Sequence, residues 1–194
     1  MTRQALLVAR AVTHTGGDEA VRRLAEDLAD TVDDAVSVCF LDGAAPSLHA
    51  ALDAAVAAGT DEVLLVPTHL PPDRYLDTWI RRAHAHWAAP QEHPPRVSVT
   101  APLAVQPAMV TALTEAINGP RRRLDGTPGP FRSPAWSTIT RHRHHVLICR
   151  GPRCTAYGAN EVAAALAERL HQHALGDDDV LVTATGCLFP CNLG

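Results

Sequence analysis

Residues 63–75, VLLVPTHLPPDRY, contain the pattern that decides the fold. The run from Glu62 to Val66 is short and almost continuously apolar, which is typical of a buried strand in a parallel sheet. Pro71, Pro72 and Asp73 then open a helix, because proline fits the first turn of a helix. The stretch therefore predicts a strand, a loop and a helix in succession. Apolar residues of that helix follow at helical spacing: Leu76, Ile80, Ala83 and Trp87.

The same succession of strand and helix recurs on both sides of this stretch. Each strand is a short apolar run, and each helix begins near a capping residue or a proline. Four alternations predict a Rossmann-like α/β domain with a parallel sheet, covering residues 1–118. The predicted strands are 5–9, 36–41, 62–66 and 96–100, and the predicted helices run from an Asp18 cap to Val32, from a Ser47 cap to Ala58, from Pro71 to Trp87 and from Pro107 to Ile117.

The second half of the chain has a different composition. Residues 119–144 are rich in glycine, proline and arginine, which predicts a linker. Residues 145–194 then form a smaller α/β unit, with strands at 145–148 and 180–184 and an Ala-rich helix at 161–175 between them.

Composition excludes several classes of protein. The 194 residues carry 17 Lys and Arg against 21 Asp and Glu, a net charge of −4, whereas a nucleic-acid binder should be basic. Hydrophobic residues make up 46%, enough for a packed core, which rules out wholesale disorder. No apolar run approaches the ~18 residues of a membrane helix, and Arg10 interrupts the apolar N-terminus before any cleavage site. We therefore expect a cytoplasmic protein that contacts neither nucleic acid nor membrane.

Four of the five cysteines form a spaced constellation. Cys149 and Cys154 follow the first strand of the second unit, and Cys187 and Cys191 follow its last, giving C-x4-C-x32-C-x3-C. Ends of parallel strands lie together, so the four thiolates can converge across the helical crossover. Four thiolates suit a 2Fe-2S cluster or a structural zinc ion, and the remaining alternative is a set of unligated core thiols.

The two cysteine segments carry a family resemblance. CRGPRCTAYG at 149–158 and TGCLFPCNLG at 185–194 resemble the thioredoxin-like 2Fe-2S ferredoxins, over about 50 residues. The resemblance implies a thioredoxin-like ferredoxin domain whose four matching cysteines hold one 2Fe-2S cluster, and a redox partner. The family continues with two further strands, whereas this sequence ends at Gly194, so we expect a domain truncated at its C-terminus.

The first domain resembles a second family, the class II sirohydrochlorin cobalt/iron chelatases. The resemblance rests on the strand ALLVA at 5–9 and on residues 63–75. It implies insertion of divalent Co, Fe or Ni into an anionic tetrapyrrole, in sirohaem or cobalamin synthesis, and often a homodimer. The family uses one histidine after the first strand and one after the third. Here Arg10 and Tyr75 match those two positions, so both expected histidines are absent.

Other side chains near these positions are candidates for the same work. His14 and His69 lie in the loops after the first and third strands, where an imidazole can hold a metal ion or accept protons near neutral pH. Arg10 and Arg74 can grip carboxylates of a tetrapyrrole. We take His69, Tyr75, Arg10 and His14 as catalytic candidates, and Arg10 and Arg74 as substrate-binding candidates. The alternatives are ordinary loop histidines and surface ion pairs.

Two functions from different classes follow. The first is a tetrapyrrole metallochelatase that carries a 2Fe-2S cluster. The second is an electron-transfer or redox-sensing protein whose chelatase-like domain has lost catalysis and only binds a ligand. A related enzyme that uses the cleft for other chemistry is a third alternative.

Overall fold

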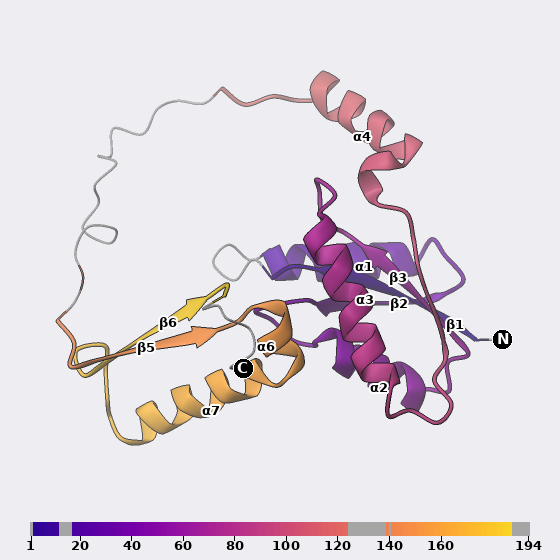
Figure 1. Ribbon diagram of the computed structural model, residues 1–194. Coiled ribbons are helices and arrows are strands. Elements are labelled where there is room, and N and C mark those ends of the chain that lie inside the picture. The colour runs from indigo at the N-terminus through magenta and orange to yellow at the C-terminus, as the bar shows by residue number, and fades with distance from the viewer. Residues whose placement is uncertain (1, 12–16, 124–138, 140, 188–194) are drawn as a thin grey trace.

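A four-stranded parallel sheet forms the centre of the N-terminal half (Figure 1). The computed structural model describes residues 2–11, 17–123, 139 and 141–187. The expected α/β alternation is confirmed, with most boundaries within one or two residues. The sheet and its helices consist of β1 (Arg3–Ala9), α1 (Gly17–Ala29), β2 (Ala35–Phe40), α2 (Leu48–Ala57), β3 (Glu62–Pro67), α3 (Arg74–Ala88), β4 (Arg96–Val99), a short 3-10 turn (Leu103–Val105) and α4 (Pro107–Asn118).

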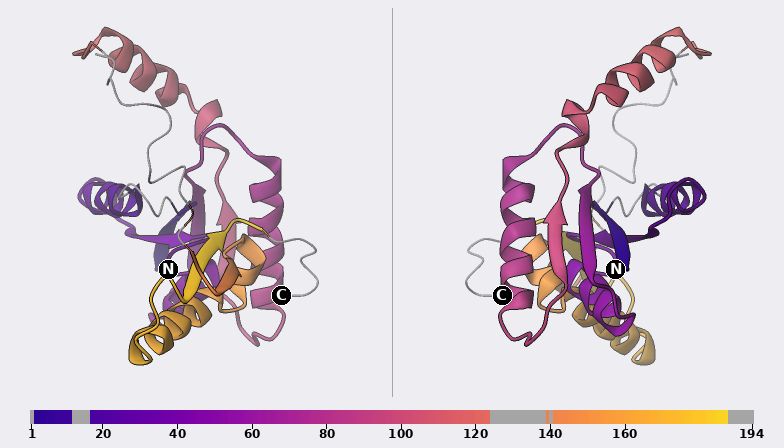
Figure 2. Two further views of the ribbon diagram at one scale, coloured as in Figure 1. Left: turned by 90° about the vertical axis from the view of Figure 1, so that its left-hand side faces the viewer. Right: turned by 90° about the vertical axis from the view of Figure 1, so that its right-hand side faces the viewer.

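The strand order of this sheet is β2-β1-β3-β4, and all pairs are parallel. β1 therefore lies between β2 and β3, with Leu7 beside Val38 on one side and Val66 on the other. The helices divide between the two faces: α1 covers one, and α2 and α3 cover the other (Figure 2). This arrangement is a doubly wound sheet, which matches the right-handed crossovers that parallel strands require.

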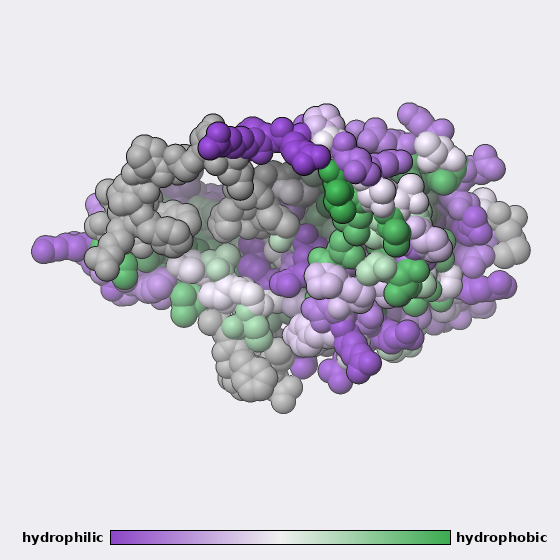
Figure 3. Space-filling model, turned by 90° about the horizontal axis from the view of Figure 1, so that it is seen from above, coloured by the Kyte–Doolittle hydropathy of each residue, from purple (hydrophilic) through white to green (hydrophobic). Residues whose placement is uncertain are grey.

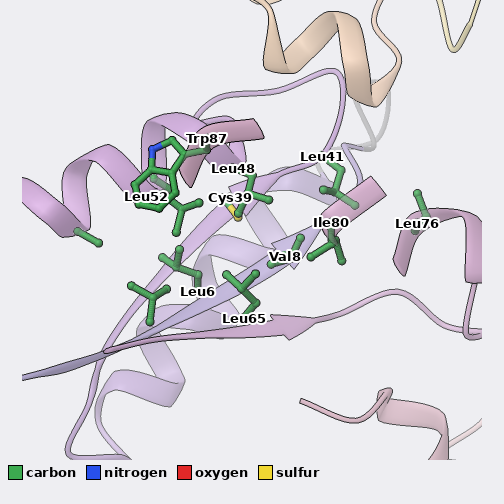
Figure 4. Close-up of a cluster of buried hydrophobic side chains, with 13 residues drawn as sticks. Leu6, Val8, Cys39, Leu41, Leu48, Leu52, Leu65, Leu76, Ile80 and Trp87 are labelled. Carbon is green, nitrogen blue, oxygen red and sulfur yellow. The ribbon is translucent and has the colours of Figure 1, made fainter. Parts of the chain in front are cut away.

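The larger hydrophobic core lies between the sheet and the pair α2–α3 (Figure 4). Alternate strand residues such as Leu6, Val8 and Leu65 point into it because successive side chains of a strand face opposite ways. Trp87 closes one end of this core, and its indole Nε1 donates a 2.7 Å hydrogen bond to Asp53. A smaller core under α1 contains Phe40 and Ala25.

Of the two predicted helix caps, Ser47 is confirmed and Asp18 is wrong, and the third helix begins at Arg74 rather than at Pro71. The Ser47 hydroxyl accepts a hydrogen bond from the Ala50 N–H, and the Asp73 carboxylate accepts one from the Tyr75 N–H. Each satisfies a backbone donor that the first turn leaves without a partner. Asp18 does not precede its helix: α1 begins at Gly17, which places Asp18 in the first turn, where its charge favours the helix dipole.

Helix α4 projects from the rest of the N-terminal half (Figures 1 and 2). None of its residues is buried, and its apolar side chains Val110, Leu113 and Ile117 are exposed. Figure 3, seen from above, shows hydrophobic residues gathered on the side of the molecule from which α4 projects. No described helix is both long and apolar enough to cross a membrane.

The C-terminal half contains a second, two-stranded parallel sheet. The sheet is formed by β5 (His144–Cys149) and β6 (Val180–Thr185), and the helices α6 (Pro152–Ala156) and α7 (Ala159–Gln172) lie between them in the chain. The short helix α6 was not expected from the sequence, and α7 begins after Gly158, whose φ of 95° suits glycine. This unit packs beside α3 and the loop between β2 and α2 (Figure 1).

Candidate functional site

The carboxyl ends of β1 and β3 are adjacent, yet the chain leaves them toward opposite faces of the sheet. α1 follows β1 on one face and α3 follows β3 on the other. Such a switch point is where open parallel sheets bind ligands. Arg10 directly follows β1, and His69 is the second residue after β3. The fold therefore brings two of the expected residues to one edge.

Arg10 is engaged by a carboxylate of the protein itself. Its Nε and one terminal guanidinium nitrogen lie 3.0 and 2.9 Å from Oδ2 of Asp42, which follows β2. The Asp42 side chain is buried, and its other oxygen accepts a 3.1 Å hydrogen bond from the Ala11 N–H. About half of the Arg10 side chain stays exposed, so its outer N–H groups can still reach an anion.

His69 is the most unusual side chain at this edge. Only 9% of its side chain is exposed, and neither ring nitrogen has a hydrogen-bond partner within the described part of the chain. Its closest charged neighbour is Asp77 of α3, with 3.6 Å between Nε2 and Oδ1. A buried polar group that lacks partners costs ~1–3 kcal/mol, which a ligand can recover. Buried side chains of this kind therefore point to a binding role.

The other residues expected at this cleft lie elsewhere. Tyr75 is half-exposed in the first turn of α3, with its ring edge-on to Trp79 at 5.9 Å. Arg74 is exposed at the start of the same helix. Tyr75 lines a small cavity shared with the cysteine segments, and His69 does not line this cavity. His14 lies outside the described residues.

Three of the four constellation cysteines line that small cavity. Cys149 ends β5, Cys154 lies on α6, and Cys187 follows β6, and the structure brings these three residues to one small cavity. Tyr75 and Trp79 of α3 form the opposite wall. Cys191 lies outside the described residues, and the residues described contain no group of three or more His, Cys, Asp or Glu close enough to hold a metal ion.

Two glycines allow the cysteine segments to approach. Cys149 pairs with Thr185 at the end of the two-stranded sheet, so Gly151 and Gly186 meet just beyond it. A Cβ at Gly151 would lie 2.3 Å from the carbonyl oxygen of Gly186 and 3.6 Å from the Cys149 sulfur. Only glycine fits this contact, which holds the two segments together.

Sequence reasoning missed two carboxylates at the cleft. Asp42 is the second residue after β2, at the same edge as Arg10, and its position after a strand was a usable signal. Asp77 is one turn into α3, and nothing in the sequence places it beside His69, because that contact depends on the path of the loop between β3 and α3.

Comparison with known families decides the identity of the N-terminal half. The CbiX family profile matches residues 4–119, which is more than half of the chain. The chain belongs to the CbiX family. The matched region corresponds to the four-stranded sheet with its helices, and ends at the start of the predicted linker.

Solved structures resemble this CbiX chain in fold. A CbiX protein of cobalamin (vitamin B12) biosynthesis from Marinobacter aquaeolei is 21% identical, with a TM-score of 0.53 over 60% of this chain and 94% of its own. SirB from Bacillus subtilis with Fe3+ is 17% identical, with a TM-score of 0.55 over 98% of this chain and 68% of its own. The sirohydrochlorin chelatase SirB from Bacillus subtilis subspecies spizizenii, in complex with cobalt, is 15% identical, with a TM-score of 0.55 over 94% of this chain and 67% of its own. No functionally curated protein matches the chain.

The expected chelatase-type fold is therefore confirmed, and the C-terminal unit is shown only as a small parallel α/β unit. The likeness to SirB extends over nearly the whole chain, so it includes β5 and β6. Neither the family match nor these structures point to a ferredoxin, and the 2Fe-2S cluster stays a prediction from the cysteine segments.

Proposed function

We propose that this CbiX chain inserts a divalent metal ion, Co, Fe or Ni, into a sirohydrochlorin-type tetrapyrrole in sirohaem or cobalamin synthesis. Family membership and the fold likeness to chelatases support the reaction class. The observation that carries the proposal is His69 at the switch point of the sheet, a nine-tenths buried imidazole whose nitrogens have no hydrogen-bond partner among the described residues.

Metal insertion exchanges a divalent cation for two pyrrole protons, with no net electron transfer. The site must therefore hold the cation and accept protons, and imidazole does both near neutral pH. Asp77 lies 3.6 Å from Nε2 of His69, which favours the tautomer with its hydrogen on Nε2 and leaves the Nδ1 lone pair for the incoming metal.

Arg10 supplies the positive charge for an anionic substrate. Asp42 fixes the guanidinium group through two contacts to one carboxylate oxygen, and the remaining N–H groups donate to a substrate carboxylate. Arginine stays charged and has no lone pair for a cation, so at this position it binds substrate and leaves metal handling to His69.

An anaerobic absorption assay tests this function. Purified protein is mixed with metal-free sirohydrochlorin, and Co2+ is added, with a protein-free sample for reference. We expect faster insertion with the protein, and a loss of about 100-fold in His69→Ala, the size of a missing acid–base group. His93→Ala, an exposed histidine between α3 and β4, is the matched control and should keep the normal rate.

Two outcomes contradict the proposal. If metal insertion is no faster with the protein than without it, the protein is not a chelatase. If the protein nevertheless shifts the absorption spectrum of the tetrapyrrole, it binds the tetrapyrrole without inserting metal. A normal rate in His69→Ala removes His69 from the mechanism.

We also propose that Cys149, Cys154, Cys187 and Cys191 hold a 2Fe-2S cluster. The cavity shared by the first three cysteines and the Gly151–Gly186 approach support this proposal. Thiolates are the usual ligands of such clusters, and backbone N–H groups near their sulfurs tune the potential. A bound cluster supplies one-electron transfer, which insertion itself does not need.

Iron, acid-labile sulfide and zinc contents test the cysteine site. Equal iron and sulfide with thiolate-to-iron absorption bands supports the cluster, whereas zinc without sulfide contradicts it. Cys154→Ser should lose the bands. Cys39→Ala should keep them, because Cys39 is buried in the core of the CbiX domain.

A further inference from the structure

A second cavity lies between the CbiX domain and the C-terminal unit. Its volume is about 200 Å³, and it is bounded by the end of β2, the start of α2, the middle of α3 and helix α6. It contains none of Arg10, His69 and Asp77, so it is separate from the cleft at the switch point. No role has been derived for it so far.

Contacts between the two halves of the chain form this cavity. The Tyr157 hydroxyl after α6 and Nε2 of His86 on α3 are 2.9 Å apart. The Asn160 side-chain amide donates a 2.8 Å hydrogen bond to the Ala44 carbonyl, and Arg150 donates to the Gly43 carbonyl. Walls from both halves are thus held in place, which gives the cavity a defined shape before any ligand enters.

The walls present flat rings. His49 and His86 are stacked, with their ring centroids 5.4 Å apart and their planes 9° from parallel. Tyr157 packs against His86 at 4.9 Å, and Trp79 lies on the same stretch of α3. These rings favour a flat ligand, because aromatic faces gain most from stacked or edge-on neighbours.

All the charged side chains on the walls are basic. Arg82 and Arg153 line the cavity, and none of the described residues that line it is Asp or Glu. The Arg82 guanidinium lies over the Trp79 ring at 5.8 Å, and that of Arg153 over the Tyr157 ring at 5.7 Å. A guanidinium group over an aromatic ring keeps its positive charge, which attracts an anion. Such a cavity repels cations and attracts carboxylates or phosphates.

We infer that this cavity is a binding site for a small planar aromatic anion, one or two rings bearing a carboxylate or a phosphate. The ring lies among Trp79, His86 and Tyr157, and the acid group faces Arg82 and Arg153. The volume is below the roughly 300–1,000 Å³ of sites for drug-sized ligands, so a whole tetrapyrrole does not fit. The inference does not depend on chelatase activity.

Calorimetric titration of the full chain with matched probes tests this site. 2-Naphthoate and phenyl phosphate carry the expected ring and charge, and 2-naphthamide keeps the ring without the charge. We expect saturable binding of the two anions at or below about 1 mM, weakening with salt, and at least tenfold weaker binding of the amide. A carboxylate and a phosphate ligand are distinguished by which probe binds more tightly.

Neighbouring arginines on α3 provide the matched variants. Arg82→Gln should weaken 2-naphthoate binding at least tenfold, whereas Arg81→Gln should leave it unchanged, because Arg81 is exposed on the same helix but does not line the cavity. Both side chains are exposed, so neither change threatens folding. Absence of saturable binding, equal binding of the amide, or equal loss in both variants would overturn the inference.

Discussion

Replacing Gly151 by alanine would test how the cysteine segments are held together. Gly151 is buried immediately before α6, and its φ of −65° is ordinary for alanine, so the substitution introduces no backbone strain. The new methyl group would lie 2.3 Å from the Gly186 carbonyl oxygen, well inside the 3.0 Å that real Cβ atoms keep. The neighbour is backbone rather than a flexible side chain, so one of the two segments has to move.

The magnitude follows from this clash. Inserting a methyl group into a tightly packed site typically costs about 1–3 kcal/mol. For a chain of this size, each kcal/mol lowers the melting temperature by about 2–4 °C. We therefore expect the transition of Gly151→Ala to fall by roughly 2–12 °C, measured by thermal unfolding. If the cysteines hold iron, the variant should also bind less iron per chain, because Cys149 and Cys187 are displaced relative to each other.

The other partner of this contact provides the control. A Cβ at Gly186 meets no atom within 4 Å, so Gly186→Ala should leave both the melting temperature and the iron content unchanged. Equal behaviour of the two variants would refute the reasoning, since it would show that the segments do not approach as closely as the structure places them.

Three further predictions concern the CbiX domain. Asp53→Ala should lower the free energy of unfolding by about 1–3 kcal/mol in urea titrations, because the buried Trp87 N–H loses its acceptor. Cys39 should resist iodoacetamide until the protein unfolds, as followed by mass spectrometry, because burial raises its pKa to about 12 and keeps it a thiol. A hydrogen bond from the Thr2 N–H lowers the pKa of Asp61 from its ordinary value of 3.8. The ionised carboxylate therefore stabilises the fold above that pH, and this stabilisation is lost as acid protonates Asp61. Asp61→Asn should make stability depend less on pH on the acid side, and an unchanged pH dependence would contradict this.

The order of strands and helices could be predicted because each element is signalled locally. Apolar runs marked the strands, and Ser47 and Asp73 marked two helix starts through hydrogen bonds to their own first turns. The short helix α6 was missed because five residues give too little periodicity to recognise. Asp18 was taken for the cap because aspartate is favoured both at the cap position and in the first turn of a helix. The residue type alone does not distinguish these two positions.

The partners of the candidate residues could not be predicted. Arg10 was expected to meet a substrate carboxylate, yet Asp42, on a different strand end, already contacts it. Tyr75 and His69 were expected in one cleft, but Tyr75 turns toward the cysteines while His69 lies near Asp77. A loop and one helical turn separate these residues, and the direction of each side chain depends on how α3 packs.

The sequence by itself determined the alternation of the CbiX domain, the position of the second unit and the pairing of cysteines with strand ends, since all of these depend on neighbouring residues. Tertiary structure alone decided the strand order, the burial of His69 beside Asp77 and the basic aromatic cavity between the two halves. These features join residues far apart in the chain, and their contacts depend on packing between elements, which local patterns do not encode.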